Sequence, residues 1–539
     1  MHVETLQIHK ESKLLKDYRN NAPSIMKFFD YHPYNDFHPR VEELMDRSYD
    51  RGELSDLLHE MNRKWSAPAS SLANIDRLKQ QDSVVVVGGQ QAGILTGPMF
   101  TINKMISIIQ LAKQQEKELN IPVIPVFWMA GEDHDFAEIN HIFVPDSSKM
   151  KKFKLFQQVA GKQSVSEIGL DKESTEEWVN QLFEQLEETT HTKGLYQSIL
   201  SSLEQANSYT DFFANLVYRL FPEEGLVLID SADKELRRME GKHFISLIQN
   251  QTEISSGTYD AAERLKKLGY SNSLDLEEND GHLFYHKNGE RILLVRDEEG
   301  MWAGKQNEIR FTSEELQQIA NNHPENLSNN VVTRPIMQEL LFPTLAFIGG
   351  PGEVGYWAVL KPAFKALQLK MPPVLPRLSF TFVERHVEKA LTKYGIKLET
   401  AVSEGVENHK QIWLKQKQDP PIHELSEEIK RKVTEAHQPL REAAKGVRAD
   451  LGDLAMKNLS YLQDTIQFLE KRIIKSLEEN YARELAEFDL ITMSLRPEDG
   501  FQERMWNPIF WINRYGVGFI TDLTNKSLSI EEKHFGVWI

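Results

Sequence analysis

Four consecutive valines run directly into a glycine-rich polar segment at Val84-Val-Val-Val-Gly-Gly-Gln-Gln-Ala-Gly-Ile-Leu-Thr-Gly97. A continuous run of β-branched residues predicts a strand buried on both faces, as in a parallel sheet. The glycines predict a tight turn, and Pro98 suits the first position of a helix that we expect to end near residue 117. A strand, a glycine-rich turn and a helix in this order predict a doubly wound α/β domain with a ligand site at the strand end.

The turn and the helix start carry side chains that suit an anionic ligand. Free backbone amides and the positive end of the helix dipole favour a carboxylate or a phosphate there. Ile94 follows the glycines where a P-loop has Lys and Ser or Thr, so this is not a P-loop. A purely structural role of the turn is the alternative. The candidate binding residues are Gly89, Gln90, Gln91, Gly93, Thr96, Gly97, Asn103 and Lys104.

A second apolar strand, predicted at 123–129, ends in a cluster of ionisable side chains. A right-handed crossover brings the ends of consecutive parallel strands to the same edge of the sheet, so this cluster should face the first turn. Its members are Glu132, Asp133, His134 and Asp135, with the last three as catalytic candidates. A helix start that carries Asp and Glu is one alternative reading. A metal site is another, but adjacent residues cannot all point at one ion, and we expect no metal.

Two later segments predict further strands of the same sheet. Thr344–Gly349 is apolar and runs into Gly349-Gly-Pro-Gly-Glu353, whose carboxylate we expect in the same crevice. Pro373–Thr381 is a short strand that carries an arginine, which suits carboxylate or phosphate capture, with a surface ion pair as the alternative. The candidates from these segments are Gly349, Gly350, Glu353, Arg377 and Ser379.

The last third of the chain has helical periodicity. Apolar residues spaced three and four apart from Ile429 to Leu477 predict a heptad seam. Pro439, Gly446 and Gly452 predict two or more helices instead of one rod. The seam predicts an oligomerisation arm, and an intrachain helical hairpin is the alternative. The segment after the helices has the polar, Pro- and Gly-containing composition of an ordered binding loop, with candidates Arg496, Gln502, Arg504 and Asn507.

Composition narrows the possible partners. The 539 residues predict two or three domains, and 63 Lys and Arg against 80 Asp and Glu give a net charge of −17, which disfavours a nucleic-acid surface. No apolar run is long enough for a membrane span and no signal peptide is apparent, so we expect a cytoplasmic protein without a membrane partner. The chain has no cysteine, which excludes a protein thiol nucleophile and would spare an enzyme with a thiol product from mixed disulfides.

Four motifs occur together in this chain: Gly89-Gln-Gln-Ala-Gly-Ile-Leu-Thr-Gly-Pro98, Gly131-Glu-Asp-His-Asp135, Gly349-Gly-Pro-Gly-Glu353 and Gln502-Glu-Arg504. In this order, with a late coiled coil, they resemble the bacillithiol synthase family over the whole chain. The resemblance implies an α/β fold with a Rossmann-like parallel-sheet core, connecting-peptide insertions as in class I aminoacyl-tRNA synthetases, and an α-helical coiled-coil domain that forms a homodimer. The His-Ile-Gly-His and Lys-Met-Ser-Lys-Ser motifs of those synthetases are absent from this sequence.

We expect five parts along the chain. They are N-terminal helices with the first half of the core at 1–148, a mainly helical insertion at 149–207, the second half of the core at 208–384 with a β-meander near 281–304, the coiled-coil dimerisation domain at 385–485, and a C-terminal segment returning to the core at 486–539.

The resemblance also implies a reaction, the ligation of the cysteine carboxyl to the amine of glucosaminyl-malate in the last step of bacillithiol biosynthesis. Amide formation needs an activated carboxyl, a deprotonated amine and donors for the developing oxyanion. We expect His134 or Asp133 to take the proton, and the amides around 89–97 to hold a phosphate or the oxyanion. Candidates for the malate carboxylates are Arg377, Arg496 and Arg504.

The sequence does not identify the cosubstrate that activates the cysteine carboxyl. ATP with magnesium is one candidate, with Thr96 and Lys104 at its phosphates. Two other functions are weighed beside the ligase: a tRNA-synthetase-like nucleotidyl-transfer enzyme acting on another small substrate, and a non-catalytic coiled-coil scaffold that retains a nucleotide-binding fold. Release of AMP or ADP during the reaction would separate the two enzyme classes.

Overall fold

The computed structural model describes residues 1–8, 11–146, 149–159 and 161–539, so the expected boundary at residue 148 lies outside the described residues. The chain forms two compact units. The first consists of Met1–Val144, Lys151–Thr381 and Gln502–Val537. The second consists of Pro145–Met150, Phe382–Phe501 and Trp538–Ile539.

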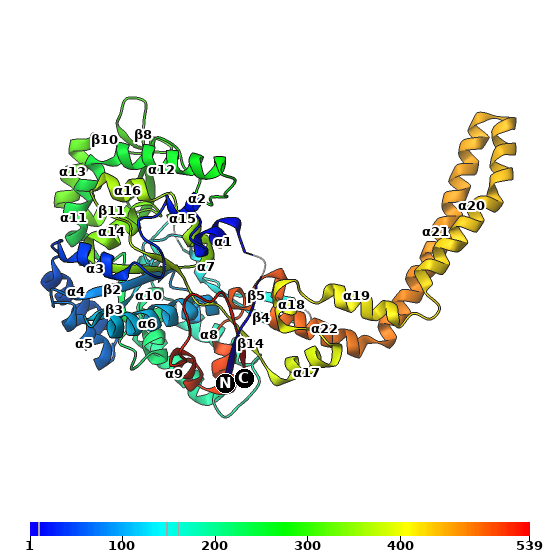
Figure 1. The fold of residues 1–539 in the computed structure, drawn as a ribbon, viewed down its shortest axis with the longest axis horizontal. Helices are drawn as coiled ribbons and strands as arrows, with labels where there is room; N and C mark the ends of the chain where they lie inside the picture. The colour runs from blue at the N-terminus through cyan, green and yellow to red at the C-terminus, as the bar shows by residue number, and fades with distance from the viewer. Residues whose placement is uncertain (9–10, 147–148, 160) are drawn as a thin grey trace. The chain divides into compact units, whose positions relative to one another are not determined.

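A five-stranded parallel sheet forms the core of the first unit (Figure 1). Its order is β13 (Val374–Pro376), β12 (Thr344–Gly349), β2 (Val84–Gln90), β3 (Val123–Met129) and β6 (Val227–Asp230), and all neighbouring strands are parallel. Both faces of the sheet are covered, and the four valines of β2 have no exposed surface. The predicted α/β class with a parallel core is therefore confirmed.

The strand order reverses beside β2. From β2 the chain adds β3 and then β6 on one side, and it later adds β12 and then β13 on the other. In open α/β sheets a ligand crevice lies at such a switch point, outside the carboxyl ends of the strands. The crossover helix α6 (Met99–Leu119) links β2 to β3, and Pro98 precedes the helix as its N-cap residue, one position before the predicted place.

The first two glycines of the valine motif belong to the strand and not to the turn. Gly88 and Gly89 pair with Phe127 and Trp128 in the register of β2 and β3. A Cβ on Gly89 would lie 2.6 Å from the carbonyl oxygen of Trp128, so the close strand packing requires glycine. The turn itself comes later, where Gly97 has a φ of +71°, a conformation that glycine adopts without strain.

Three smaller sheets accompany the core. One five-stranded antiparallel sheet has the order β10 (Arg310–Phe311), β9 (Trp302–Gly304), β8 (Glu290–Arg296), β7 (Asp280–Lys287) and β11 (Leu327–Asn329). A three-stranded sheet has the order β1 (His2–Thr5), β15 (Phe535–Trp538) and β14 (Phe380–Val383), and β4 (His141–Asp146) pairs with β5 (Lys149–Lys154).

The first unit contains further α-helices. They are α1 (Lys13–Arg19), α2 (Pro23–Met26), α3 (Phe37–Met45), α4 (Arg51–Lys64), α5 (Ala69–Arg77), α7 (Phe136–Ile139), α8 (Lys172–Phe183), α9 (Thr192–Gln205), α10 (Tyr209–Leu220), α11 (Lys234–Gln249), α12 (Gln251–Lys267), α13 (Ser313–Asn322), α14 (Thr333–Leu341), α15 (Pro351–Trp357), α16 (Lys361–Ala366), α23 (Ile509–Tyr515) and α24 (Gly518–Thr524). Among the described residues, no helix is long and apolar enough to cross a membrane.

The second unit is helical. Its shorter helices are α17 (Arg385–Tyr394), α18 (Leu398–Ser403), α19 (Glu407–Gln416) and α22 (Ala482–Leu495). Two long helices, α20 (Ile422–Val447) and α21 (Ala449–Asn480), pack against each other as a hairpin, shown in yellow and orange in Figure 1. The break falls at Arg448, whose backbone is extended, while Pro439 and Gly452 lie inside the helices and do not end them. The heptad seam therefore closes within one chain.

Candidate active site

A cavity of about 420 Å³ lies at the switch point of the parallel sheet. The residues that follow β2, β3, β12 and β13 form its walls, together with side chains from α6, α14 and α15. Its lining is Gly89, Gln90, Gln91, Phe100, Lys104, Ala130, Asp133, Glu138, Ser273, Val331, Arg334, Gly350, Pro351, Gly352, Glu353, Tyr356, Arg377 and Arg504. Nine of the residues predicted from the sequence therefore line one cavity: Gly89, Gln90, Gln91, Lys104, Asp133, Gly350, Glu353, Arg377 and Arg504.

Lys104 joins the two halves of the sheet at this cavity. Its buried ammonium donates to the Gly89 carbonyl at 2.6 Å and to Gln90 Oε1 at 3.0 Å, both at the end of β2. It also donates to the carboxylate of Glu353, which accepts the Gly350 amide at the start of α15. Burial lowers the pKa of Lys104, and the neighbouring Glu353 carboxylate opposes that shift.

Arg377 meets Glu503 in a buried bidentate pair. Its Nη1 and Nη2 donate to the two carboxylate oxygens of Glu503 at 2.8 and 2.6 Å, and Asn103 donates to the same carboxylate at 2.6 Å. Burial opposes the ionisation of Glu503, but the guanidinium outweighs burial and holds the pKa of that carboxyl below its usual range. Ser379 also bonds to Glu503. Arg377 is thus already paired within the protein, and the ion pair weighed as the alternative to ligand capture is buried and not on the surface.

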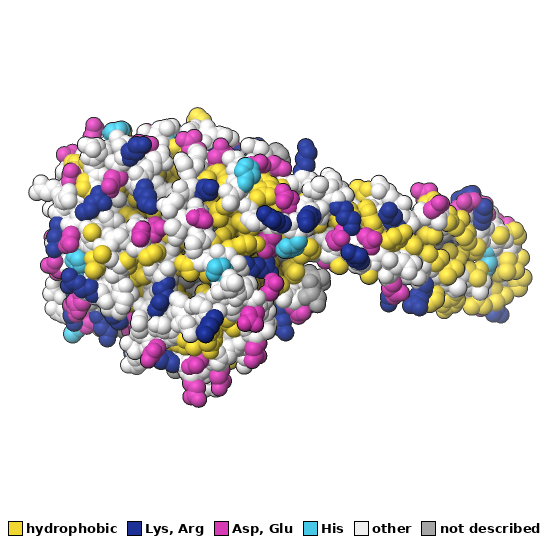
Figure 2. Space-filling model, turned by 90° about the horizontal axis from the view of Figure 1, so that it is seen from below, with side chains coloured by type: hydrophobic (Ala, Val, Ile, Leu, Met, Phe, Trp, Pro, Cys, Tyr) yellow, Lys and Arg dark blue, Asp and Glu magenta, His cyan; other side chains and the backbone are white. Residues whose placement is uncertain are grey.

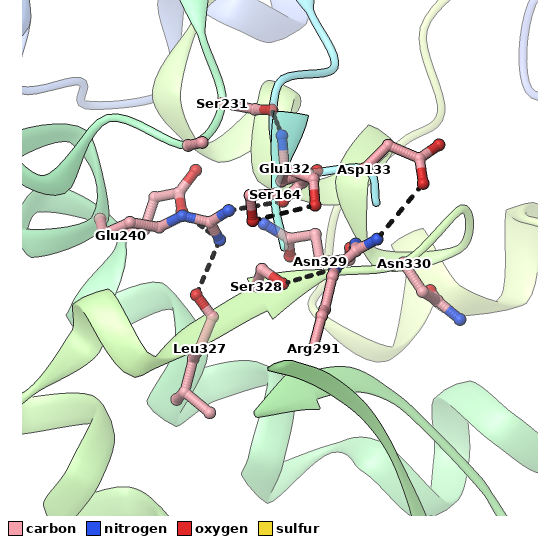
Figure 3. Close-up of polar contacts among 12 residues, drawn as sticks. Glu132, Asp133, Ser164, Ser231, Glu240, Arg291, Leu327, Ser328, Asn329 and Asn330 are labelled. Atoms are coloured by element: carbon pink, nitrogen blue, oxygen red, sulfur yellow. Dashed lines mark hydrogen bonds and ion pairs between the residues drawn. The ribbon is translucent and has the colours of Figure 1, made fainter. Parts of the chain in front are cut away.

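Two carboxylates face the cavity from the segment after β3. Gln91 donates to Asp133 Oδ2 at 2.6 Å, which links the turn after β2 to the acidic cluster. Figure 3 shows Asp133 and Arg291 pointing toward each other, with 3.7 Å between Asp133 Oδ1 and Arg291 Nη1. Burial, followed by repulsion from Asp135 and Asp133, raises the pKa of Glu138.

His134 is not among the residues that line the cavity. Its Nδ1 lies 3.7 Å from Asp133 Oδ1, and burial together with the nearby Arg291 lowers its pKa. The imidazole is therefore neutral at pH 7. Asp135 accepts the Ala137 amide and caps α7, which is the helix-start role weighed against a catalytic one. Within this cluster, Asp133 is the catalytic candidate in contact with the cavity.

Glu132 points away from the cavity into a second buried ion network. It accepts from Arg237 Nη2 at 2.6 Å, while Arg237 Nη1 donates to the Leu327 carbonyl at 2.8 Å and lies 3.5 Å from Glu240. Figure 3 labels Glu132, Glu240 and Leu327, and its dashed lines mark contacts of this network. Burial raises the pKa of Glu240 to about 8, so that carboxyl is protonated at pH 7.

Some backbone amides between β2 and α6 that the sequence suggested as open are bonded within the protein. The Gly93 and Gly97 amides donate to the carbonyls of Gln91 and Ile94, and the first amide of α6 donates to Trp506. The side-chain amide of Asn507 stabilises the turn by donating to the Leu95 and Gly97 carbonyls at 3.0 and 2.7 Å. The Gly93, Gly97 and Met99 amides are therefore not free for a ligand, and an anion site at the other amides of this segment stays a prediction.

Several residues that were predicted for the site do not line the cavity and instead pack or bond within the fold. Thr96 is buried beside the turn, Gly349 ends β12, and Gln502 is buried next to Glu503. Arg496 belongs to the second unit, where its guanidinium donates to the Val402 carbonyl at 2.7 Å. The predicted residues outside the cavity lining are His134, Asp135, Gly93, Thr96, Gly97, Asn103, Glu132, Gly349, Ser379, Arg496, Gln502 and Asn507.

Sequence reasoning missed four polar side chains of the cavity: Glu138, Ser273, Arg334 and Tyr356. Tyr356 follows Glu353 by three residues, one helical turn, so helical periodicity after the glycine motif would have found it. Glu138 lies just beyond the acidic cluster. No pattern in the sequence distinguishes Arg334, at the start of α14, from the other arginines.

One group of three ligand-type side chains close enough for a metal ion occurs among the described residues: His423, Glu427 and Glu470 in the helical hairpin. The ammonium of Lys430 lies 2.8 Å from Glu427 and 3.7 Å from Glu470, so a cationic side chain already offsets the charge of this cluster. It carries no argument for a metal.

The sheet order defines a Rossmann-like α/β unit with a polar cavity at its switch point, and the chain continues in a unit that contains a helical hairpin. Family models agree with this division: "Bacillithiol biosynthesis BshC, N-terminal Rossmann-like domain" matches residues 1–378, and "Bacillithiol biosynthesis BshC, C-terminal coiled-coil domain" matches residues 380–537. The chain belongs to the BshC family of bacillithiol biosynthesis.

Full-length relatives support the same family. The protein of Oceanobacillus iheyensis named "Putative cysteine ligase BshC" is 44% identical over 99% of both chains. Proteins with the same name from Bacillus licheniformis and Geobacillus sp. WCH70 are 41% identical over 99% of both chains and 39% identical over 100% of both chains.

Proposed function

We propose that this chain is a cysteine ligase that joins the carboxyl of cysteine to the amine of glucosaminyl-malate in the last step of bacillithiol biosynthesis. Membership of the BshC family and the printed name of its relatives support this assignment. The observation that carries it is the cavity at the switch point, whose lining combines carboxylate side chains with cationic side chains. The cysteine-free chain suits a thiol product, and we place the reaction in the cytoplasm, where thiols stay reduced.

In the proposed reaction the sugar amine attacks the activated cysteine carboxyl. The C–N bond forms, the bond from the carboxyl carbon to its leaving group breaks, and the amine gives up a proton. Asp133 accepts this proton, since it lines the cavity and Gln91 fixes its carboxylate. Lys104 and Gln90, which line the same cavity, stabilise the negative charge that develops on the carboxyl oxygen.

ATP with magnesium is the proposed activating cosubstrate. The Gly93 and Gly97 amides of the turn after β2 are bonded within the protein, so side chains of the cavity are the proposed phosphate ligands. Lys104 and Arg504 are cationic side chains of the lining that would fit this role, and Glu138 would supply a carboxylate oxygen of the kind that magnesium prefers.

Mass spectrometry of the purified protein with cysteine and glucosaminyl-malate, with and without ATP and magnesium, tests the function. The proposal expects the amide product of the two substrates. AMP as coproduct would indicate an adenylate and ADP an acyl phosphate. Absence of the amide product under every condition would contradict the ligase assignment and favour the non-catalytic scaffold.

The two members of the acidic cluster are expected to differ in importance. Asp133→Asn should lower turnover by about 10²-fold or more, because it removes the proton acceptor and keeps the shape of the side chain. His134→Gln should change turnover far less, since the imidazole does not line the cavity. Steady-state rates of both variants measure this, with circular dichroism as the folding control. A larger loss in His134→Gln than in Asp133→Asn would move the base to the histidine.

The helical hairpin is proposed to form a homodimer. An apolar ridge on α21 consists of Leu454, Tyr461 and Phe468, which are spaced seven residues apart and are 61–68% exposed, and α20 exposes Leu440 and Val447 as well. Figure 2 shows hydrophobic side chains gathered on this hairpin. Such a heptad ridge is the surface that coiled-coil partners bury.

Sedimentation velocity tests the dimer. The wild-type chain should sediment at twice its mass of 62.3 kDa, and the double variant Tyr461→Glu/Phe468→Glu should sediment as a monomer because two charges enter the ridge. Lys432→Glu, an exposed charge change on α20 outside the ridge, is the control and should stay dimeric. A monomeric wild-type chain would refute the dimer without affecting the proposed reaction.

A further inference from the structure

The cations of the cavity differ in how well the protein neutralises them. Lys104 is paired with Glu353, and Arg377 is held by both oxygens of Glu503. Arg334 lines the same cavity, and among the described residues no carboxylate forms an ion pair with its guanidinium. It is therefore a half-buried cation of this cavity that lacks a direct counter-charge.

The guanidinium of Arg334 also has unused hydrogen-bonding capacity. Its Nη2 donates to the hydroxyl of Tyr356 at 2.6 Å, while its Nε is buried and, among the described residues, has no hydrogen-bond partner. Tyr356 belongs to α15 and lines the cavity as well. A buried donor without a partner costs about 1–3 kcal/mol, and a charged one costs more, so a fold keeps such a group where a ligand satisfies it.

We infer that Arg334, oriented by Tyr356, is the anion-binding residue of this cavity and binds a carboxylate or phosphate oxygen of a substrate. The planar guanidinium matches both groups, which accept two parallel hydrogen bonds from it. Lys104 and Arg377 each already have a carboxylate partner, whereas the guanidinium of Arg334 has none among the described residues. The inference rests on the proposed function and adds the residue that recognises the acidic part of the substrate.

The surroundings of Arg334 are consistent with an anionic ligand and not with a second cation. Burial disfavours the charge of Arg334, yet the Tyr356 hydroxyl and the more distant Glu353 and Glu132 carboxylates outweigh burial and raise its pKa. Arg334 therefore stays charged at every pH at which the fold is stable. Arg504, an exposed side chain of the same lining, adds a second positive charge at the cavity.

Isothermal titration calorimetry on the full chain tests the inference with two probes, L-malate and inorganic phosphate. Wild-type protein should bind at least one of them, and Arg334→Gln should weaken that binding by about 10-fold or more, as expected for the loss of a charge-assisted bidentate contact. Arg334→Lys keeps the positive charge but lacks the two parallel N–H donors of the guanidinium, so it should restore only part of the affinity. Arg238→Gln changes an exposed arginine of the same unit and should bind like wild type.

The outcomes separate the sources of the anion. If Arg334→Gln weakens the binding of malate alone, Arg334 binds a substrate carboxylate. If it weakens the binding of phosphate alone, Arg334 binds a phosphate group. Equal binding of both probes by wild type and Arg334→Gln, or no binding of either probe by wild type, would overturn the inference. If Arg334→Gln does not fold, Arg334→Lys gives the decisive comparison. Failure to form the amide product, with probe binding still dependent on Arg334, would refute the reaction alone.

Discussion

Lys104→Met is expected to lower turnover by about 10²–10³-fold, the range found when a preorganised donor at the reacting centre is removed. The ammonium binds the end of β2 and the Glu353 carboxylate of α15 at the same time, so its loss removes the contact that joins the two sides of the crevice. The measurement is the rate of product formation with saturating substrates. A turnover within a factor of about three of wild type would exclude Lys104 from the reaction.

The same substitution leaves Glu353 without its partner, so stability needs a separate control. Glu353→Gln combined with Lys104→Met replaces the ion pair by two uncharged side chains of similar size and should recover most of the stability lost in Lys104→Met. Turnover should stay low in the double variant because the cation is still missing. Recovery of turnover together with stability would show that Lys104 acts only through the fold.

Arg237→Met is expected to reduce the free energy of unfolding by about 3–5 kcal/mol, the usual effect of removing one partner of a buried ion pair. The guanidinium bonds to Glu132 and to the Leu327 carbonyl, and among the described residues both carboxylate oxygens of the neighbouring Glu240 lack a hydrogen-bond partner. Without Arg237 the buried Glu132 carboxylate loses its counter-charge. Urea unfolding followed by tryptophan fluorescence measures the loss.

The adjacent residue provides the matched control for this prediction. Arg238 is exposed and pairs with Glu235 on the surface of α11, so Arg238→Met should change the free energy of unfolding by less than about 1 kcal/mol. Similar losses in the two variants would mean that the Glu132 network adds no more to stability than a surface ion pair. Arg237→Met/Glu132→Gln should recover part of the loss, because it removes the uncompensated carboxylate as well.

The sheet could be predicted from the sequence because its signals are local. Four consecutive valines in β2, and apolar runs at β3 and β12, have no other stable place than a strand covered on both faces. The role of Gly88 and Gly89 could not be predicted in the same way. Their need for glycine comes from the distance to Trp128 and Ile348 on neighbouring strands, which is a property of the assembled sheet.

The sequence predicted that helices pack against each other in this region, but not whether the packed helices belong to one chain or to two. A heptad pattern shows that two helices pack together, but the same pattern describes one chain folding back and two chains meeting. The break at Arg448 decides in favour of a hairpin within the chain, and proline and glycine were not sufficient signals, since Pro439 and Gly452 remain within helices.

The site could be predicted only in part. Motifs at strand ends identified Gln91, Lys104, Asp133 and Glu353 because topology brings strand ends to one edge. Which charges are neutralised inside the protein could not be predicted, since the partners are distant in the sequence: Arg377 pairs with a residue 126 positions away. Long-range pairing thus decides which cations of the cavity keep their charge available for a ligand.

A crystal structure of the protein with glucosaminyl-malate bound tests the central claim most directly, because the claim is that the switch-point cavity is the reaction site. The account predicts density for the ligand in this cavity, with its amine near Asp133 and a malate carboxylate on the guanidinium of Arg334. Ligand density at another place in the molecule, with this cavity holding only solvent, would contradict it.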